Sequence, residues 1–153
     1  MAKRVRTLLF SVGLLLVGII IGGYLFAKTQ SRSFLALHKC DQTCLRPNEL
    51  AGLLASVGIQ RFSSLLPSVV METDKTIVID QSSPGTRIHY LIIPKKDIKN
   101  IAEASEDDKE YLMDAFRVAS NIVKEQRLQE YRLTTNGPSY QTATYLHFHL
   151  TAQ

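Results

Sequence analysis

Polar and apolar side chains alternate without a break in the stretch YLHFHL, residues 145–150. Successive residues of a β-strand point to opposite faces of its sheet, so Tyr145, His147 and His149 are predicted to share one face. The three apolar residues share the other face, which can pack against a helix. The pattern therefore predicts a final strand, Ala143–Thr151, whose outer side carries two imidazoles.

The two imidazoles are predicted to lie side by side, with Cβ atoms roughly 7 Å apart along the strand. That gap suits a phosphate group. A neutral imidazole is a nucleophile and a charged one is a hydrogen-bond donor, and the ring changes between these forms near physiological pH. Two other interpretations are open: the histidines have no function, or they ligate a metal whose site folding would complete with Cys40, Cys44 and His89.

The remaining sequence predicts an α+β layer fold with five strands, a short helix and a long helix. Pro47 at a first helical turn begins the short helix, which ends at Gly58. Ser105 and Asp108 form a capping-box pattern that begins the long helix, and it ends near Leu128. The long helix is predicted to pack through Tyr111, Leu112, Ala115, Phe116, Ala119, Ile122 and Val123. The other strands are predicted within residues 68–73 and at Thr76–Asp80, Arg87–Pro94 and Tyr131–Thr135.

An uncharged run, Thr7–Ala27, is long enough to cross a bilayer as one helix. The alternative is a cleaved signal peptide, whose apolar core is usually shorter and whose cleavage site needs small residues. Leu25 occupies the best such site, so the sequence favours an uncleaved anchor. This divides the chain into a basic tail (1–6), a transmembrane helix (7–27), a linker (28–39) and a domain (40–153).

The formal net charge of +4 owes much to Lys3, Arg4 and Arg6, which precede the apolar run. Because basic residues collect on the cytoplasmic side of a membrane helix, the tail is predicted to be cytoplasmic and the domain periplasmic or extracellular. The sequence has no alternation of basic and aromatic residues and no zinc-finger spacing. No nucleic-acid partner is therefore predicted.

Two blocks of the sequence resemble the signature segments of the histidine-triad superfamily. The first is NGPSYQTATYLHFHL, residues 136–150, in which a glycine-containing loop and a Gln-Thr pair precede the alternating histidines. The second runs from Asp80 to Lys96, where an apolar strand ends in Pro-Lys. A capped amphipathic helix lies between the blocks, and the resemblance covers Val69 to Leu150.

The resemblance implies an antiparallel five-stranded sheet packed against one long and one short helix. It also implies a nucleotidyl hydrolase or transferase without a cofactor, which acts on a nucleotide or nucleotide conjugate. Association into a homodimer is implied by the resemblance alone.

Five positions match catalytic residues of the superfamily. His147 matches the nucleophile, which attacks the α-phosphorus and forms a nucleotidyl-histidine that water then cleaves. His149 matches a histidine that donates to phosphate oxygens, and His89 matches one that supports the cluster from the neighbouring strand. Gln141 and Thr142 match loop residues that contact the transferring phosphate or the leaving group.

Two further positions are predicted to bind the nucleotide, and one departs from the family pattern. Asp80 matches an acidic residue that holds the ribose hydroxyls, and Asn136 begins the glycine-containing loop. Tyr145 stands at the first triad position, where the family has histidine. A phenol donates one hydrogen bond but stays neutral, so a working or weakened site is expected.

The resemblance also bears on metal binding. Some bacterial members hold structural zinc with two cysteines and two histidines, but Asp97 and Tyr145 stand at the two histidine positions here. No metal site is therefore predicted. Cys40 and Cys44 are expected to form a disulfide in an exported domain or to remain reduced, buried thiols.

The membrane segment narrows the expected substrates, because soluble nucleotides are scarce outside the cytoplasm, whereas a bilayer-bound domain can meet lipid-linked nucleotides. The CDP-diacylglycerol pyrophosphatases, one branch of the superfamily, have a similar layout, which extends the prediction to a lipid-linked nucleotide. The alternative function is a membrane-anchored nucleotide-binding or interaction module whose catalysis has weakened.

Overall fold

One antiparallel sheet of five strands organises the domain. The computed structural model describes residues 2–34, 45–82 and 88–152. The helices are α1 (Ala2–Phe26), α2 (Pro47–Arg61) and α3 (Lys109–Glu125), and the strands are β1 (Val69–Glu72), β2 (Thr76–Asp80), β3 (Ile88–Pro94), β4 (Tyr131–Thr135) and β5 (Phe148–Ala152). The strand order is β1-β2-β3-β5-β4, with every neighbouring pair antiparallel. The predicted fold class is confirmed.

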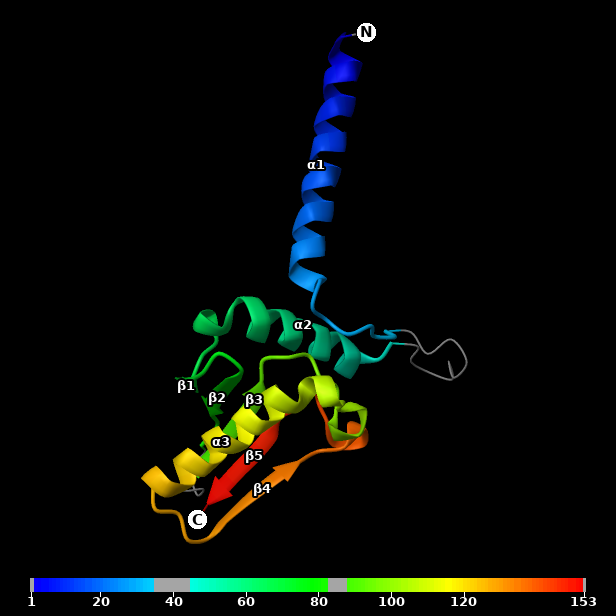
Figure 1. Ribbon diagram of the computed structural model, residues 1–153. Coiled ribbons are helices and arrows are strands. Elements are labelled where there is room, and N and C mark those ends of the chain that lie inside the picture. The colour runs from blue at the N-terminus through cyan, green and yellow to red at the C-terminus, as the bar shows by residue number, and fades with distance from the viewer. Residues whose placement is uncertain (1, 35–44, 83–87, 153) are drawn as a thin grey trace.

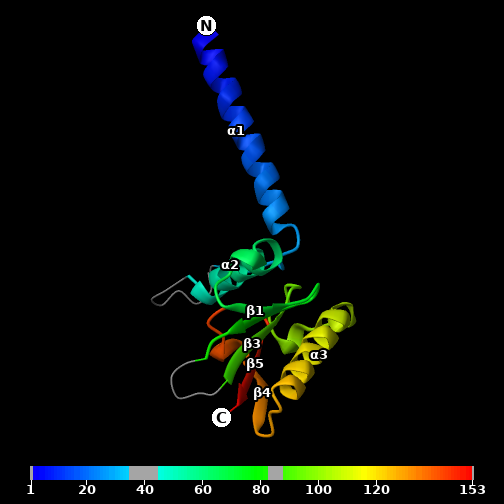
Figure 2. The ribbon, with the colours of Figure 1, turned by 90° about the vertical axis from the view of Figure 1, so that its left-hand side faces the viewer.

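Helices α2 and α3 cover opposite faces of this sheet (Figure 1, Figure 2). Because side chains alternate along each strand, Ile92 of β3 packs in the core under α3, whereas Ile93 packs with Ile59 of α2. Phe148 and Leu150 of β5 also belong to the α3 side. The odd-numbered residues of β3 and β5, the histidines among them, consequently lie on the α2 side.

The long helix α3 follows the predicted capping box. Ser105 and Asp108 exchange side-chain and backbone hydrogen bonds around a short 3-10 turn, and the α-helix begins at Lys109. The helix buries Ala115, Val118, Ala119 and Ile122. Phe116 was expected on this face, but it lies at the rim, where 45% of its surface is exposed and its ring meets Phe148.

The final strand is shorter than the alternation predicts, since β5 begins at Phe148 and not at Ala143. The backbone of the preceding segment bonds to other elements. The amide of Thr144 donates to the carbonyl of Asn48, and the amide of Leu146 donates to the carbonyl of Ile98. These groups cannot also join the β3 ladder, so the segment is held as an irregular approach to the strand.

Helix α1 is apolar and extends away from the domain (Figure 1). Its residues Arg4–Phe26 are long and apolar enough to cross a membrane, and the apolar window is 0% buried. Membrane anchors and signal sequences share this length and composition.

The segment after α1, predicted as a linker, is bound to the domain through Arg32. The guanidinium donates twice to the Asp97 carboxylate, at 2.6 and 2.7 Å, and once to the carbonyl of Thr144 at 2.8 Å. The backbone amide of Gln30 donates to the same carboxylate at 2.8 Å. The side chains of Arg32 and Asp97 are 0% and 1% exposed, so this is a buried bidentate ion pair.

A glycine in α2 lets that helix approach the same cluster. A Cβ atom at Gly52 would lie 2.4 Å from the hydroxyl of Thr144 and 3.0 Å from Nε of Arg32. Any larger residue would therefore push α2 away from the ion pair and from the segment that leads into β5.

Replacing Arg32 with alanine is expected to lower the free energy of unfolding by about 3–5 kcal/mol, because Asp97 would remain as a buried charge without its partner. Lys75→Ala is the matched control, since it removes an exposed ion pair with Glu110 and should change stability little. Urea denaturation of the detergent-solubilised chain, followed by tyrosine fluorescence, compares the two. Similar small losses in both variants would contradict a buried clamp.

Candidate active site

Three imidazoles meet on the α2 side of the sheet. Nε2 of His89 lies 3.0 Å from Nδ1 of His149, and their rings are stacked with centroids 5.3 Å apart. The ring of His147 meets that of His149 edge-on, with centroids 4.9 Å apart. The sequence-predicted trio is thus brought together from two strands.

The pairing of β3 with β5 explains this convergence. In the antiparallel register, His149 stands opposite Leu91 and His89 stands opposite Thr151. The two histidines are therefore diagonal neighbours on one face, within reach of each other. His147 precedes the first residue of β5 by one position and continues the same alternation.

The hydrogen bond of His147 fixes which of its nitrogens is free. Nδ1 lies 2.7 Å from the backbone carbonyl of Tyr145. A carbonyl only accepts, so Nδ1 carries the hydrogen, and in the neutral ring the lone pair is on Nε2. The hydroxyl of Thr135 in β4 donates to the carbonyl of His147 at 2.9 Å, which fixes the backbone at this residue.

His149 is enclosed by partners on both ring nitrogens. Nδ1 faces His89, and Nε2 lies 3.3 Å from the amide nitrogen of Asn136. With the amide as donor, Nε2 accepts and the ring hydrogen is on Nδ1, directed to His89. Burial lowers the pKa of His149, and the nearby rings of His147 and His89 lower it further. His149 is therefore a neutral ring at neutral pH.

Asp80 lies next to this cluster, at the end of β2. It stands opposite Tyr90, the residue after His89. The hydroxyl and the backbone amide of Ser82 both donate to Oδ1 of Asp80, and these bonds lower the pKa of the carboxyl. The hydroxyl of Ser82 also accepts from the backbone amide of His89 at 3.3 Å. A charged carboxylate is thus kept beside the histidines.

Gln141 and Thr142 are not joined to the histidines in the same way. Gln141 is buried, and its amide donates to the carbonyl of Lys99 at 3.1 Å, while its side-chain oxygen makes no bond within the described residues. Thr142 is exposed. Across the described ranges, no hydrogen bond links either side chain to His89, His147 or His149.

Tyr145 occupies the first triad position, but its side chain is part of the core. The phenol is 2% exposed, packs with Ile59, Ile77 and Ile93, and donates to the carbonyl of Pro94 at 2.9 Å. Burial raises its pKa, so the hydroxyl stays protonated. Only the backbone carbonyl of Tyr145 serves the histidine cluster.

The positions that would carry zinc-binding histidines have other partners. Asp97 is paired with Arg32, and Tyr145 is bonded to the backbone. Among the described residues no group of three or more His, Cys, Asp or Glu side chains could hold a metal ion. Cys40 and Cys44 lie outside the described residues, as does the predicted choice between a disulfide and free thiols.

Two contacts were not foreseen from the sequence. The Thr135 hydroxyl had no motif to mark it, although its place in β4 opposite Phe148 was within a predicted strand. The carbonyl of Tyr145 was missed because a sequence pattern identifies side chains and not the partners of a backbone group. Asn136 was predicted to contact the nucleotide, and the structure places its amide against His149.

Comparison with known proteins identifies the fold and the family. A family model described as "Scavenger mRNA decapping enzyme C-term binding" matches residues 64–153. The chain belongs to this family, within the histidine-triad superfamily. The match includes all five strands, α3 and the three clustered histidines, whereas α1, α2 and Arg32 lie outside it.

Individual histidine-triad proteins resemble the chain over most of their length. The adenosine 5'-monophosphoramidase HINT3 of Danio rerio is 24% identical over 123 residues, which cover 74% of this chain and 77% of that protein. The structure of a HIT family hydrolase from Clostridium thermocellum is 31% identical with a TM-score of 0.55, over 63% of this chain and 89% of that one. A HIT family hydrolase from Legionella pneumophila is also 31% identical, with a TM-score of 0.54 over 60% and 87% of the two chains.

The low pKa of His149 can be measured in this histidine-triad protein. In a proton NMR pH titration, His149 is expected to titrate below about 6.5, the ordinary value for histidine. His147→Asn removes a ring that disfavours the charged form of His149 and should raise the pKa of His149 without restoring the ordinary value, because burial is the largest cause. A His149 that titrates at or above the ordinary value would contradict the buried arrangement.

Proposed function

We propose that the chain is a nucleotidyl hydrolase or transferase in which Nε2 of His147 attacks the α-phosphorus of a nucleotide conjugate. The observation that carries this proposal is the hydrogen bond from Nδ1 of His147 to the carbonyl of Tyr145. It holds the ring in the tautomer whose Nε2 lone pair is available, and it resists rotation of the ring during attack.

The reaction has two displacements at phosphorus. In the first, the Nε2 lone pair forms a P–N bond, and the bond from phosphorus to the leaving group breaks, with its electron pair going to the leaving group, which takes a proton from water. In the second, a water or another acceptor attacks phosphorus and loses a proton, and the P–N electron pair returns to Nε2. The neutral His147 is restored.

Residues around His147 can stabilise the negative charge of the transferring phosphate by donating hydrogen bonds to its oxygens. Asn136 has a second amide hydrogen for a phosphate oxygen. Once its ring takes a second proton, Nε2 of His149 no longer accepts from Asn136 and can donate to a phosphate oxygen. The negative charge of a bound phosphate opposes the burial that lowers the pKa of His149. Preorganised donors of this kind contribute most of the stabilisation of phosphoryl-transfer transition states.

The nucleoside end of the substrate is assigned to Asp80. Its carboxylate is charged and lies at the end of β2 next to His89, where it can accept hydrogen bonds from ribose hydroxyls. Gln141 and Thr142 are assigned to the leaving-group side. Two copies of the chain are predicted to associate, as the family resemblance implies.

An adenosine 5'-phosphoramidate is the first substrate to test, because a similar protein bears the name adenosine 5'-monophosphoramidase. The apolar surface of α1 favours a second class, a lipid-linked nucleotide, for a domain anchored to a membrane by α1. Release of AMP from an adenosine phosphoramidate and release of CMP from CDP-diacylglycerol separate the two classes. Turnover of the phosphoramidate with no release from the lipid would exclude the lipid substrate.

His147→Ala is expected to lower kcat on the turned-over substrate on the order of 10³-fold or more, as loss of a nucleophile does in other enzymes. Tyr145→Phe is the matched control. It removes a hydroxyl that faces Pro94 and leaves the carbonyl that orients His147, so kcat should stay within a few-fold of the parent. The two variants are compared by release of AMP at saturating substrate.

The same variants test the binding-module alternative. If the parent binds AMP in calorimetry but releases no nucleotide from either conjugate, and His147→Ala binds AMP equally well, the chain is a binding module. Turnover that survives in His147→Ala would assign the nucleophile elsewhere.

A further inference from the structure

Helix α2 is apolar on the side that faces away from the sheet. At 100° per residue, Leu50, Leu54 and Val57 lie opposite the buried face formed by Gly52, Ser56 and Ile59. Leu50 is 51% exposed and Leu54 is 62% exposed. The charged residues of α2 are at its two ends, Glu49 and Arg61. A helix that is apolar all round normally has partners on every side, so this outer face is left without its partner.

The outer face of α2 is continuous with the end of the apolar helix α1. The guanidinium of Arg61 lies 4.1 Å from the ring centroid of Tyr24 and donates to its carbonyl at 2.8 Å. In both ribbon views α2 lies crosswise below α1, between α1 and the sheet (Figure 1, Figure 2). A bilayer that contains α1 would therefore end at the level of α2.

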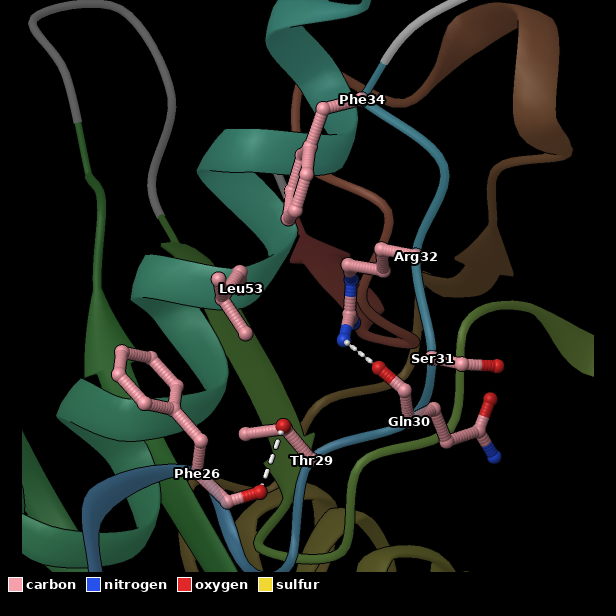
Figure 3. A pocket seen from close by; sticks show the side chains of 7 residues that line it. All are labelled: Phe26, Thr29, Gln30, Ser31, Arg32, Phe34 and Leu53. Carbon is pink, nitrogen blue, oxygen red and sulfur yellow. Dashed lines mark hydrogen bonds between the residues drawn. The ribbon is translucent and has the colours of Figure 1, made fainter. Parts of the chain in front are cut away.

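A shallow apolar pocket extends this surface. The pocket has a volume of about 250 Å³ and lies between α2 and the segment that follows α1. Figure 3 shows Phe26, Phe34 and Leu53 around it, with the guanidinium of Arg32 directed to the carbonyl of Gln30. These side chains come from three separate segments, and together with Leu50 and Leu54 they form one apolar surface on the α1 side of the domain.

Basic residues border the same surface. A cavity of about 590 Å³ beside the end of α2 is lined by Lys28, Arg61, Lys95 and Lys96, together with Asp74, Gln60 and Tyr111. Lys95 and Lys96 already pair with Glu72 and Asp108. Among the described residues, Lys28 and Arg61 have no acidic partner, so the charge that this cavity can offer to an anionic group comes from these two cations. An apolar helix face with basic residues at its edge is the composition of helices that lie in membrane interfaces.

We propose that α2 is an interfacial helix, whose Leu50 and Leu54 enter a bilayer of anionic phospholipids while Lys28 and Arg61 contact the headgroup phosphates. This inference rests on the proposed anchoring of the chain by α1. It assigns a lipid partner to a surface that lies outside the residues matched by the family. A second copy of the chain is the competing occupant of the same face.

The chain contains no tryptophan, so single tryptophans report on each surface in turn. Leu54→Trp probes the outer face of α2, Leu15→Trp probes the middle of α1, and Met113→Trp probes α3, where Met113 is 60% exposed. Each full-length variant is reconstituted into phosphatidylcholine vesicles containing phosphatidylglycerol, with or without bromine on the acyl chains. Quenching of fluorescence by the brominated chains measures contact with the bilayer.

The expected result is strong quenching of Leu15→Trp, quenching of Leu54→Trp that is several-fold larger than that of Met113→Trp, and a blue-shifted emission from Leu54→Trp. Quenching of Leu54→Trp should fall when phosphatidylglycerol is omitted.

If Leu15→Trp is not quenched, the anchoring by α1 fails and the proposal fails with it. If Leu15→Trp is quenched and Leu54→Trp is not, α2 does not lie on the bilayer although the chain is anchored. A blue shift of Leu54→Trp without quenching would assign the face to a second copy and would also overturn the proposal.

Discussion

The antiparallel pairing of β3 with β5 is the constraint on which the rest of the domain depends. Its register sets Ile92 opposite Phe148 and Leu91 opposite His149, so both strands turn apolar residues to α3 and histidines to the other side. A slip of one residue would bury the imidazoles under α3 and expose Phe148. Core formation and assembly of the histidine cluster therefore select the same register, and neither can be altered without the other.

Local patterns were sufficient to predict most of this arrangement. Alternation in residues 145–150 predicted the two faces of β5, and the capping box at Ser105 predicted the start of the long helix. The exposed rim position of Phe116 and the late start of β5 at Phe148 depend on packing, which a periodicity does not contain. The ion pair of Arg32 with Asp97 joins residues 65 positions apart, and the sequence around neither residue indicates its partner. Such a long-range contact has no local signal, so residues 28–39 were interpreted as a linker.

At the first triad position, the side chain of Tyr145 departs from the family pattern, but its backbone carbonyl still orients His147. Tyr145 changes the chemistry of the side chain, and from the sequence this suggested a weakened site. Its phenol is buried in the core beneath α2, while its carbonyl accepts from Nδ1 of His147. Orientation of His147, the proposed nucleophile, needs only that carbonyl, which any residue provides. The demand on this position is that its side chain fill the space next to Ile93 and satisfy the carbonyl of Pro94.

Helix α2 separates the proposed lipid surface from the histidine side of the sheet. Its inner residue Ile59 packs against Tyr145, two residues before His147, while Leu54 points to the opposite side. An α-helix with its side chains is about 10–12 Å across, so a bilayer against α2 would lie roughly that far from the layer of the histidines. A nucleotide joined to a lipid would have to extend its α-phosphorus by that distance to meet His147, whereas a soluble conjugate has no such limit. In the proposed arrangement, the thickness of α2 would limit which lipid-linked nucleotides reach His147. The Arg32 clamp keeps that spacing fixed, because it ties the segment after α1 to Thr144 and so to the approach of His147.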